Sequence, residues 1–239
     1  MADADLVLVN GLNLDGWAQQ YLDRAGDVPI VTVTQGIDPA DPQRRLRRQA
    51  EPHAWMALDS ARIYVDNIAA AMAQADPDNA AAYAANADDY KQQISDVVGP
   101  LRDAARALPQ DRRYLVTSEG AFSYLARDFG LTEMYLWPIN AEGQGTPQQV
   151  RALIDAMRDT GAPVIFSEST ISDRPARSIA AETGRTMAAS SMWTACRTRT
   201  GRCPPIWTCC GLRRRLSWTR WPMADPQTQR DPWASRSAT

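Results

Sequence analysis

The stretch "RYLVTSEGAFSYLARDFGLTEMYLWPI", residues 113–139, decides the fold class of this chain. Its apolar and β-branched runs predict strands at 113–118 and 134–139, and the segment between them, 120–129, predicts a helix. Strands that alternate with helices pair in parallel, so this stretch predicts an α/β fold. The alternation continues in three further expected elements, a helix at 147–160, a strand at 163–168 and a helix at 173–183.

The first 108 residues contain similar strands, followed by two long helices. Apolar runs predict strands at 6–10 and 29–34. Apolar side chains at helical spacing predict helices over about 59–75 and about 79–108. At 1.5 Å per residue the second helix would be roughly 40 Å long, and Gly99-Pro100 predicts a kink in it. This pattern predicts two α/β lobes joined by a long linking helix.

Charge divides the chain into two parts of different composition. The chain carries 26 Lys and Arg against 28 Asp and Glu, a net charge of −2. Residues 1–184 have a net charge of −10, whereas residues 185–239 carry ten arginines and two aspartates, a net charge of +8. The element pattern and the change in charge together predict an N-terminal lobe over 1–78, a linking helix over 79–108, a C-terminal lobe over 109–184 and a separate tail over 185–239.

The tail, residues 185–239, allows three interpretations. Its four cysteines lack a C-x2-C pair and a nearby histidine, so they are weak as a zinc site. Arg213–Arg215 among tryptophans match a nucleic-acid-binding arm in composition, which is the alternative function for the chain. The codons of Met192-Trp193-Thr194, read one base earlier, encode Val-Asp after the first residue. This last observation favours a frameshift near Gly184–Arg185 and an out-of-frame, disordered tail.

Two side chains are candidate metal ligands. His53, the only histidine, lies in "EPHAWM" (51–56) before the first long helix. Glu119 follows a predicted strand and opens a predicted helix, at the strand ends where open α/β sheets bind ligands. An imidazole and a carboxylate can share a divalent cation, and the oxygen ligand favours Mn²⁺ or Fe²⁺ over Zn²⁺. Each residue alone is also compatible with a structural role, as a hydrogen-bonding histidine or a carboxylate at a helix N-terminus.

Enzymatic chemistry and a membrane-spanning role have little support in the sequence. The segment "SEST" (167–170) suggests a nucleophile, but the chain has no G-x-S-x-G elbow and His53 has no recognisable partner pattern. We therefore expect no enzymatic activity. No apolar run approaches the 18 or so residues of a membrane span, and the N-terminus lacks the basic and apolar regions of a signal peptide.

Five motifs in order carry a family resemblance: "ADLVLVNGLNLDGW" (4–17), "EPHAWM" (51–56), "YLVTSEGAFSYLARDFGL" (114–131), "INAEGQGTPQQV" (139–150) and "VIFSESTISDRPARSIAAETG" (164–184). Together they resemble the manganese/zinc/iron solute-binding receptors of bacterial ABC transporters. The resemblance implies two Rossmann-like lobes joined by a rigid helix, with the metal in the cleft between them. It also implies a periplasmic or membrane-associated extracellular location and an ABC permease as partner. We expect a monomer that does not bind nucleic acid.

The resemblance also implies a set of four metal ligands. The second is the histidine of a D-P-H-x-W-like motif, which matches His53, with Glu51 in place of the aspartate. The third is a glutamate in manganese-type members and matches Glu119. The first ligand precedes the "ADLVLVNG" strand and the fourth is an aspartate after the "AAETG" helix, and neither has a match. We therefore expect a truncated and frameshifted receptor with an incomplete first lobe, which binds Mn²⁺, Fe²⁺ or Zn²⁺ weakly or not at all.

Overall fold

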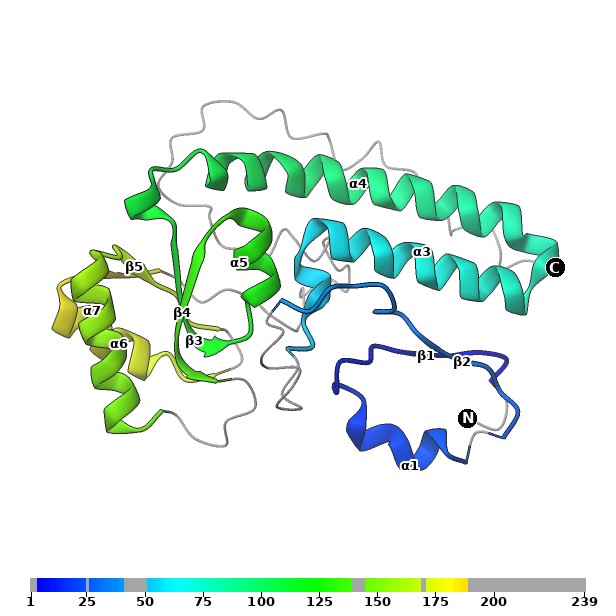
Figure 1. Ribbon diagram of the computed structural model, residues 1–239, viewed down its shortest axis with the longest axis horizontal. Coiled ribbons are helices and arrows are strands. Elements are labelled where there is room, and N and C mark those ends of the chain that lie inside the picture. The colour runs from blue at the N-terminus through cyan, green and yellow to red at the C-terminus, as the bar shows by residue number, and fades with distance from the viewer. Residues whose placement is uncertain (1–3, 25, 41–50, 139–144, 169–170, 189–239) are drawn as a thin grey trace, which may run out of the picture.

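A computed structural model describes residues 4–24, 26–40, 51–138, 145–168 and 171–188 of the chain (Figure 1). Within these residues the strands form three parallel pairs, which confirms the predicted α/β class. The pairs are β1 (Val7–Val9) with β2 (Ile30–Thr32), β3 (Tyr114–Gly120) with β4 (Thr132–Pro138), and β5 (Val164–Ile165) with β6 (Thr186–Met187).

The connection between β1 and β2 contains helical turns that the sequence did not predict. They are the 3-10 helix Gly16–Ala18 and α1 (Gln19–Leu22). Seven residues are too few to show helical periodicity, and Ala18 is the one buried residue among them. Just before these turns, Gly11 has a φ of +76° and lies against Thr32, where a Cβ would be 2.6 Å from Cγ2. This position therefore requires glycine.

Two long antiparallel helices, α3 (Leu58–Ala75) and α4 (Ala80–Arg106), follow the first strand pair. The short 3-10 helix Pro77–Asn79 joins them. Pro100 lies inside α4, and the helix continues beyond it to Arg106. Figure 1 shows α4 running from the side of β1 and β2 to the side of β3 and β4. At 1.5 Å per residue its 27 residues span roughly 40 Å.

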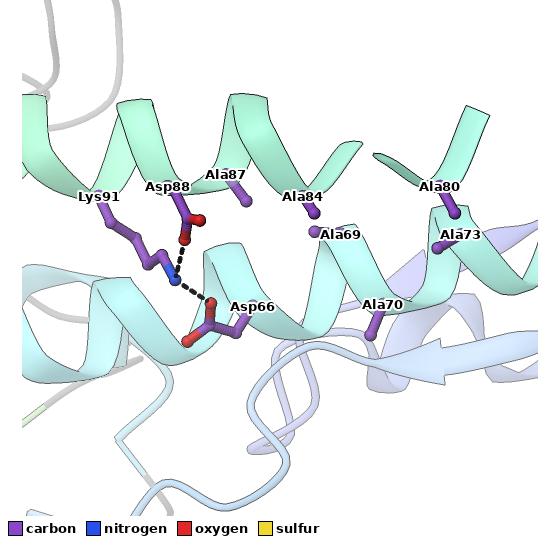
Figure 2. A pocket seen from close by; sticks show the side chains of 9 residues that line it. All are labelled: Asp66, Ala69, Ala70, Ala73, Ala80, Ala84, Ala87, Asp88 and Lys91. Atoms are coloured by element: carbon purple, nitrogen blue, oxygen red, sulfur yellow. Dashed lines mark hydrogen bonds and ion pairs between the residues drawn. The ribbon is translucent and has the colours of Figure 1, made fainter. Parts of the chain in front are cut away.

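Small side chains line the contact between α3 and α4. Figure 2 shows alanines of both helices around a pocket of about 240 Å³. At one end of this pocket, Lys91 Nζ on α4 lies 2.6 Å from Asp66 Oδ1 on α3 and 3.0 Å from Asp88 Oδ1. Nearer the start of α3, larger buried residues of the two helices form a core, with Leu58, Ile94 and Val98 as members. The two helices therefore pack along one continuous seam.

The strands after α4 form the larger core. β3 and β4 pair from Tyr114↔Thr132 to Gly120↔Pro138, and α5 (Ser123–Phe129) connects them. The N–H of Phe166 donates to the carbonyl of Val116 over 2.8 Å, which joins the segment after β5 to β3. α6 (Pro147–Thr160) and α7 (Arg174–Thr183) cover this part, and the 3-10 helix Gln110–Arg112 precedes β3.

The last described strand lies in the segment that the sequence assigned to the aberrant tail. Gly184 ends α7 with a φ of +66°, and the chain then enters β6. Thr186 pairs with Val164, Met187 packs against the larger core, and the N–H of Ala188 donates to the carbonyl of Ile165. β6 therefore extends the described C-terminal part to Ala188, within the segment expected to be a separate tail, and the expected domain bounds stay a prediction. The remaining tail, 189–239, lies outside the described residues.

None of the helices in the described part of the chain combines the length and the apolar character needed to cross a membrane.

Candidate metal centre

His53 is held at the start of a short helical turn by a neighbouring carboxylate. It precedes the 3-10 helix Ala54–Met56, which leads into α3. Glu51 Oε1 accepts the main-chain N–H of His53 over 2.9 Å and also pairs with the ring nitrogen Nδ1. A carboxylate on Nδ1 favours the tautomer whose lone pair is on Nε2, which is how metal-binding histidines are commonly oriented.

Glu51 is itself buried, with 3% of its surface exposed. Burial raises the pKa of its carboxyl group above the ordinary value of 4.5, and the pairing with His53 opposes this shift. Its second oxygen, Oε2, has no hydrogen-bond partner among the described residues. In metal sites, a carboxylate commonly holds the imidazole of a metal-binding histidine in this way. His53 and the buried Glu51 have this arrangement.

Aromatic residues connect His53 to the first strand pair. The ring of Trp55 meets the His53 ring edge to face at 5.0 Å and the Tyr64 ring at 6.3 Å. The hydroxyl of Tyr64 donates to Asn10 Oδ1, and Asn10 Nδ2 donates to the carbonyl of Pro52 over 3.1 Å. The end of β1 therefore supports the loop that carries His53.

Glu119 lies in a strand and not at a helix start. β3 extends through Gly120 and α5 begins at Ser123, so the predicted helix start at 120 is corrected. The strand is longer than predicted because β4 pairs with it as far as Gly120. The N–H of Glu119 donates to Glu168 Oε1 over 3.1 Å. Glu119 is thus held by tertiary contacts within a strand, and it does not open a helix as predicted.

The segments that carry His53 and Glu119 meet through α5. Tyr124 on α5 is buried with Ala54 and Ala57, which lie within four residues after His53. Glu119 precedes α5 by four residues, so both candidate ligands flank this contact. Within the described residues, no group of three or more His, Cys, Asp or Glu side chains could hold a metal ion. The ligand set of His53 and Glu119 stays a prediction.

Two buried acids near the candidate ligands were not recognised from the sequence as their partners. Glu51 was noted only as a replacement for an aspartate, and Glu168 only as part of a nucleophile-like "SEST". Ser167 in that motif is fully buried, which argues against a nucleophile. For Glu168 the available signal was an acidic residue at the end of an apolar run, because such a side chain is buried only when it has a partner.

These observations define an α/β protein with two candidate metal ligands near the ends of parallel strands. One is the histidine His53, which the carboxylate of Glu51 supports, and the other is the carboxylate of Glu119. The family model described as "Zinc-uptake complex component A periplasmic" (ZnuA) matches residues 1–198. The chain belongs to this family of metal ABC transporter solute-binding proteins.

Curated relatives share substantial sequence identity with the chain. It is 50% identical over 183 residues to "Iron-binding protein YfeA" of Yersinia pestis, which covers 76% of this chain and 58% of YfeA. It is 31% identical over 190 residues to "Manganese ABC transporter substrate-binding lipoprotein PsaA" of Streptococcus pneumoniae, with coverage of 76% and 62%. The chain therefore spans about three fifths of the length of these relatives.

Solved structures share the fold. A manganese-bound periplasmic metal-binding protein from Candidatus Liberibacter asiaticus is 36% identical, with a TM-score of 0.75, and the match covers 87% of this chain and 77% of that one. A crystal structure of ZnuA is 26% identical, with a TM-score of 0.68 and coverage of 79% and 71%. None of these comparisons supports the nucleic-acid-binding alternative, and Arg213–Arg215, on which it rests, lie outside the described residues.

Proposed function

We propose that this chain binds a transported metal ion as the solute-binding component of an ABC importer, with Mn²⁺ as the metal and Fe²⁺ or Zn²⁺ as alternatives. The observation that carries the proposal is the support of His53 by the buried Glu51, in a chain of the ZnuA family. An imidazole nitrogen with a carboxylate oxygen suits Mn²⁺ and Fe²⁺ better than a thiolate-rich site would. The metal is the cargo of this function and takes no part in a reaction.

In this proposal residues 1–78 and 109–184 act as two lobes and residues 79–108 as the helix between them. His53 belongs to the first lobe and Glu119 to the second. The partner is an ABC permease, the location is extracytoplasmic, and the chain acts as a monomer without enzymatic activity. The names of the curated relatives support this assignment, since they describe metal-binding lipoproteins of ABC transporters.

The metal-binding proposal is tested by titrating the full chain with Mn²⁺ and measuring free Mn²⁺ by electron paramagnetic resonance. We expect binding of one ion, weaker than in a four-ligand site, because the described residues supply two candidate ligands. His53→Ala and Glu119→Gln should each reduce the affinity. Glu182→Gln is the matched control, because Glu182 lies exposed on α7, and its carboxylate forms an ion pair with Arg158 at 3.7 Å. No binding, or unchanged affinity in both ligand variants, would contradict the proposal.

A further inference from the structure

Glu168 is an acidic residue that is buried almost completely, with 1% of its surface exposed. It follows β5, in a segment that the hydrogen bond from Phe166 to Val116 holds beside β3. Its neighbour Ser167 is fully buried as well. Removal of a carboxyl group from water is unfavourable unless it gains hydrogen bonds inside the protein. The hydrogen bonds of Glu168 therefore explain why its carboxyl group can be buried at this position.

One oxygen of Glu168 holds the backbone of a candidate metal ligand. Glu168 Oε1 accepts the N–H of Glu119 over 3.1 Å, across 49 positions of the sequence. The other oxygen, Oε2, has no hydrogen-bond partner among the described residues. A hydrogen bond from an amide to a carboxylate is stronger than one between neutral groups. This bond therefore restricts the rotation of the peptide group that precedes Glu119.

The peptide group on the other side of Glu119 is restricted too. The carbonyl of Glu119 accepts the hydroxyl of Thr117 over 2.8 Å and the N–H of Ala121 over 3.0 Å. Gly120 lies so close to the Tyr135 ring that a Cβ would be 2.8 Å from it. With both peptide groups fixed, the direction in which the Glu119 side chain leaves β3 is fixed as well.

We propose that Glu168 is a positioning residue, which aims the carboxylate of Glu119 at the bound metal by holding its main-chain N–H. The inference rests on the proposed function, because the direction of Glu119 matters only if Glu119 is a ligand. Residues that orient metal ligands in this indirect way change affinity about 10- to 100-fold when they are removed.

The test uses the full chain with Mn²⁺ alone as the probe. Glu168→Ala removes the acceptor and should lower the Mn²⁺ affinity about 10-fold or more. Glu168→Gln keeps an acceptor oxygen in the same place and should restore most of that affinity. Glu182→Ala, on the exposed face of α7, should leave it unchanged. Equal loss in the alanine and glutamine variants of Glu168 would overturn the proposal, since charge and not position would then be responsible.

A double-mutant cycle separates positioning from general stabilisation. In a Glu119→Gln background, Glu168→Ala should cause little further loss of affinity, because its effect acts through the Glu119 carboxylate. A loss as large as in the unsubstituted chain would overturn the inference. If Glu119→Gln lowers affinity but Glu168→Ala does not, this inference fails and the proposed function stands. If the unsubstituted chain binds no Mn²⁺, both fail.

A metal-free measurement covers the case in which Glu168→Ala does not fold. In the folded Glu168→Gln variant, the amide proton of Glu119 should move upfield in the nuclear magnetic resonance spectrum, because a neutral acceptor forms a weaker hydrogen bond. The amide proton of Leu115, which lies earlier in β3, is the internal control. An unchanged Glu119 amide would overturn the proposal.

Discussion

Tyr64 shows at the scale of one residue how the surroundings of His53 are built. Its ring contacts Trp55 and its hydroxyl donates to Asn10, so it joins α3 to the end of β1. Burial raises the pKa of the Tyr64 hydroxyl above its ordinary value of 10, and the nearby Tyr124 and Glu51 add to this shift. The protonated form is therefore favoured in the folded protein.

Tyr64→Phe should make stability less dependent on alkaline pH. Above pH 10 the unfolded chain releases the Tyr64 proton, while the folded chain keeps it up to its higher pKa. The free energy of unfolding therefore falls as pH rises through this range. Denaturant unfolding at pH 8 and pH 11 should show a smaller fall for Tyr64→Phe than for the unsubstituted chain. The exposed Tyr21→Phe is the control, and equal pH dependence in both variants would contradict the prediction.

Some residues of the candidate metal site could be predicted from the sequence, and others could not. His53 and Glu119 were identified as candidates because a histidine before a helix and a glutamate after an apolar run are visible locally. The support of Glu119 by Glu168 was not visible, because the contact spans 49 positions and depends on strand pairing. Glu51 and His53 are close in sequence, but the role of Glu51 in holding the imidazole ring depends on the burial of Glu51 in the folded chain.

At the scale of elements, Asp128 joins three helices. It lies on α5, and its Oδ2 accepts the N–H of Leu58 at the start of α3 over 2.8 Å. Its Oδ1 lies 3.4 Å from Arg102 Nη1 on α4. Asp128 is 8% exposed, so both contacts are largely shielded from water. The start of α3 therefore depends on a cap from a different helix, since no side chain near Ala57 supplies one.

Asp128→Ala should destabilise the protein by about 3 kcal/mol, since it leaves a helix N-terminus uncapped and a partly buried arginine without this partner. Thermal unfolding checks this prediction. Asp103→Ala, which changes a residue on α4 outside these contacts, is the comparison. Similar melting temperatures for the two variants would show that Asp128 is not an important cap.

The start of α6 is a prediction that the structure confirms in detail. The helix predicted at 147–160 is α6, and reciprocal hydrogen bonds between Thr146 and Gln149 cap its start. Thr146→Ala should reduce the free energy of unfolding by about 1 kcal/mol. Chemical denaturation measures this change, and Thr160→Ala at the other end of α6 is the comparison. A larger loss of unfolding free energy in Thr160→Ala would contradict the prediction that the cap formed by Thr146 contributes more to stability than Thr160 does.

Most elements were predicted to within a few residues, and the exceptions have physical causes. α6 begins and ends where its periodicity predicts. β3 ends two residues later than predicted because β4 pairs with its end, a contact that periodicity does not contain. α1 and β6 were not predicted, because four and two residues carry too little pattern. Local sequence patterns predicted the type and order of the helices and strands. Pairing between distant segments determined where some of them begin and end.

Among the described residues, the buried hydrophobic side chains form separate cores. The larger core contains side chains from β3 onwards only, with Met157 and Ile179 fully buried in it. The core between α3 and α4 contains Leu58, Ile94 and Val98, with Phe129 of α5 packed against it. Within the described ranges no residue belongs to both of these cores, and Ala54, Ala57 and Tyr124 form a third, small cluster. We therefore expect the two parts to open separately.

Met157→Ala should destabilise the larger core by about 3 kcal/mol and leave α3 protected. Hydrogen exchange should accelerate in residues 114–188 and change little in α3. Ile94→Ala, in the other core, should give the opposite pattern. Uniform acceleration in both variants would show that the molecule opens as one unit.

The separation of the two cores has a consequence for a ligand held by both His53 and Glu119. In the proposed site, the segments of the two donors meet where Tyr124 of α5 packs with Ala54 and Ala57, so the second donor would reach a bound ion at an effective concentration that depends on how the two cores are oriented about this contact. Substitutions in α4 or at Asp128, which contact neither donor, would then alter that concentration. The strength of metal binding would report on the geometry of the whole chain, including parts remote from the ion.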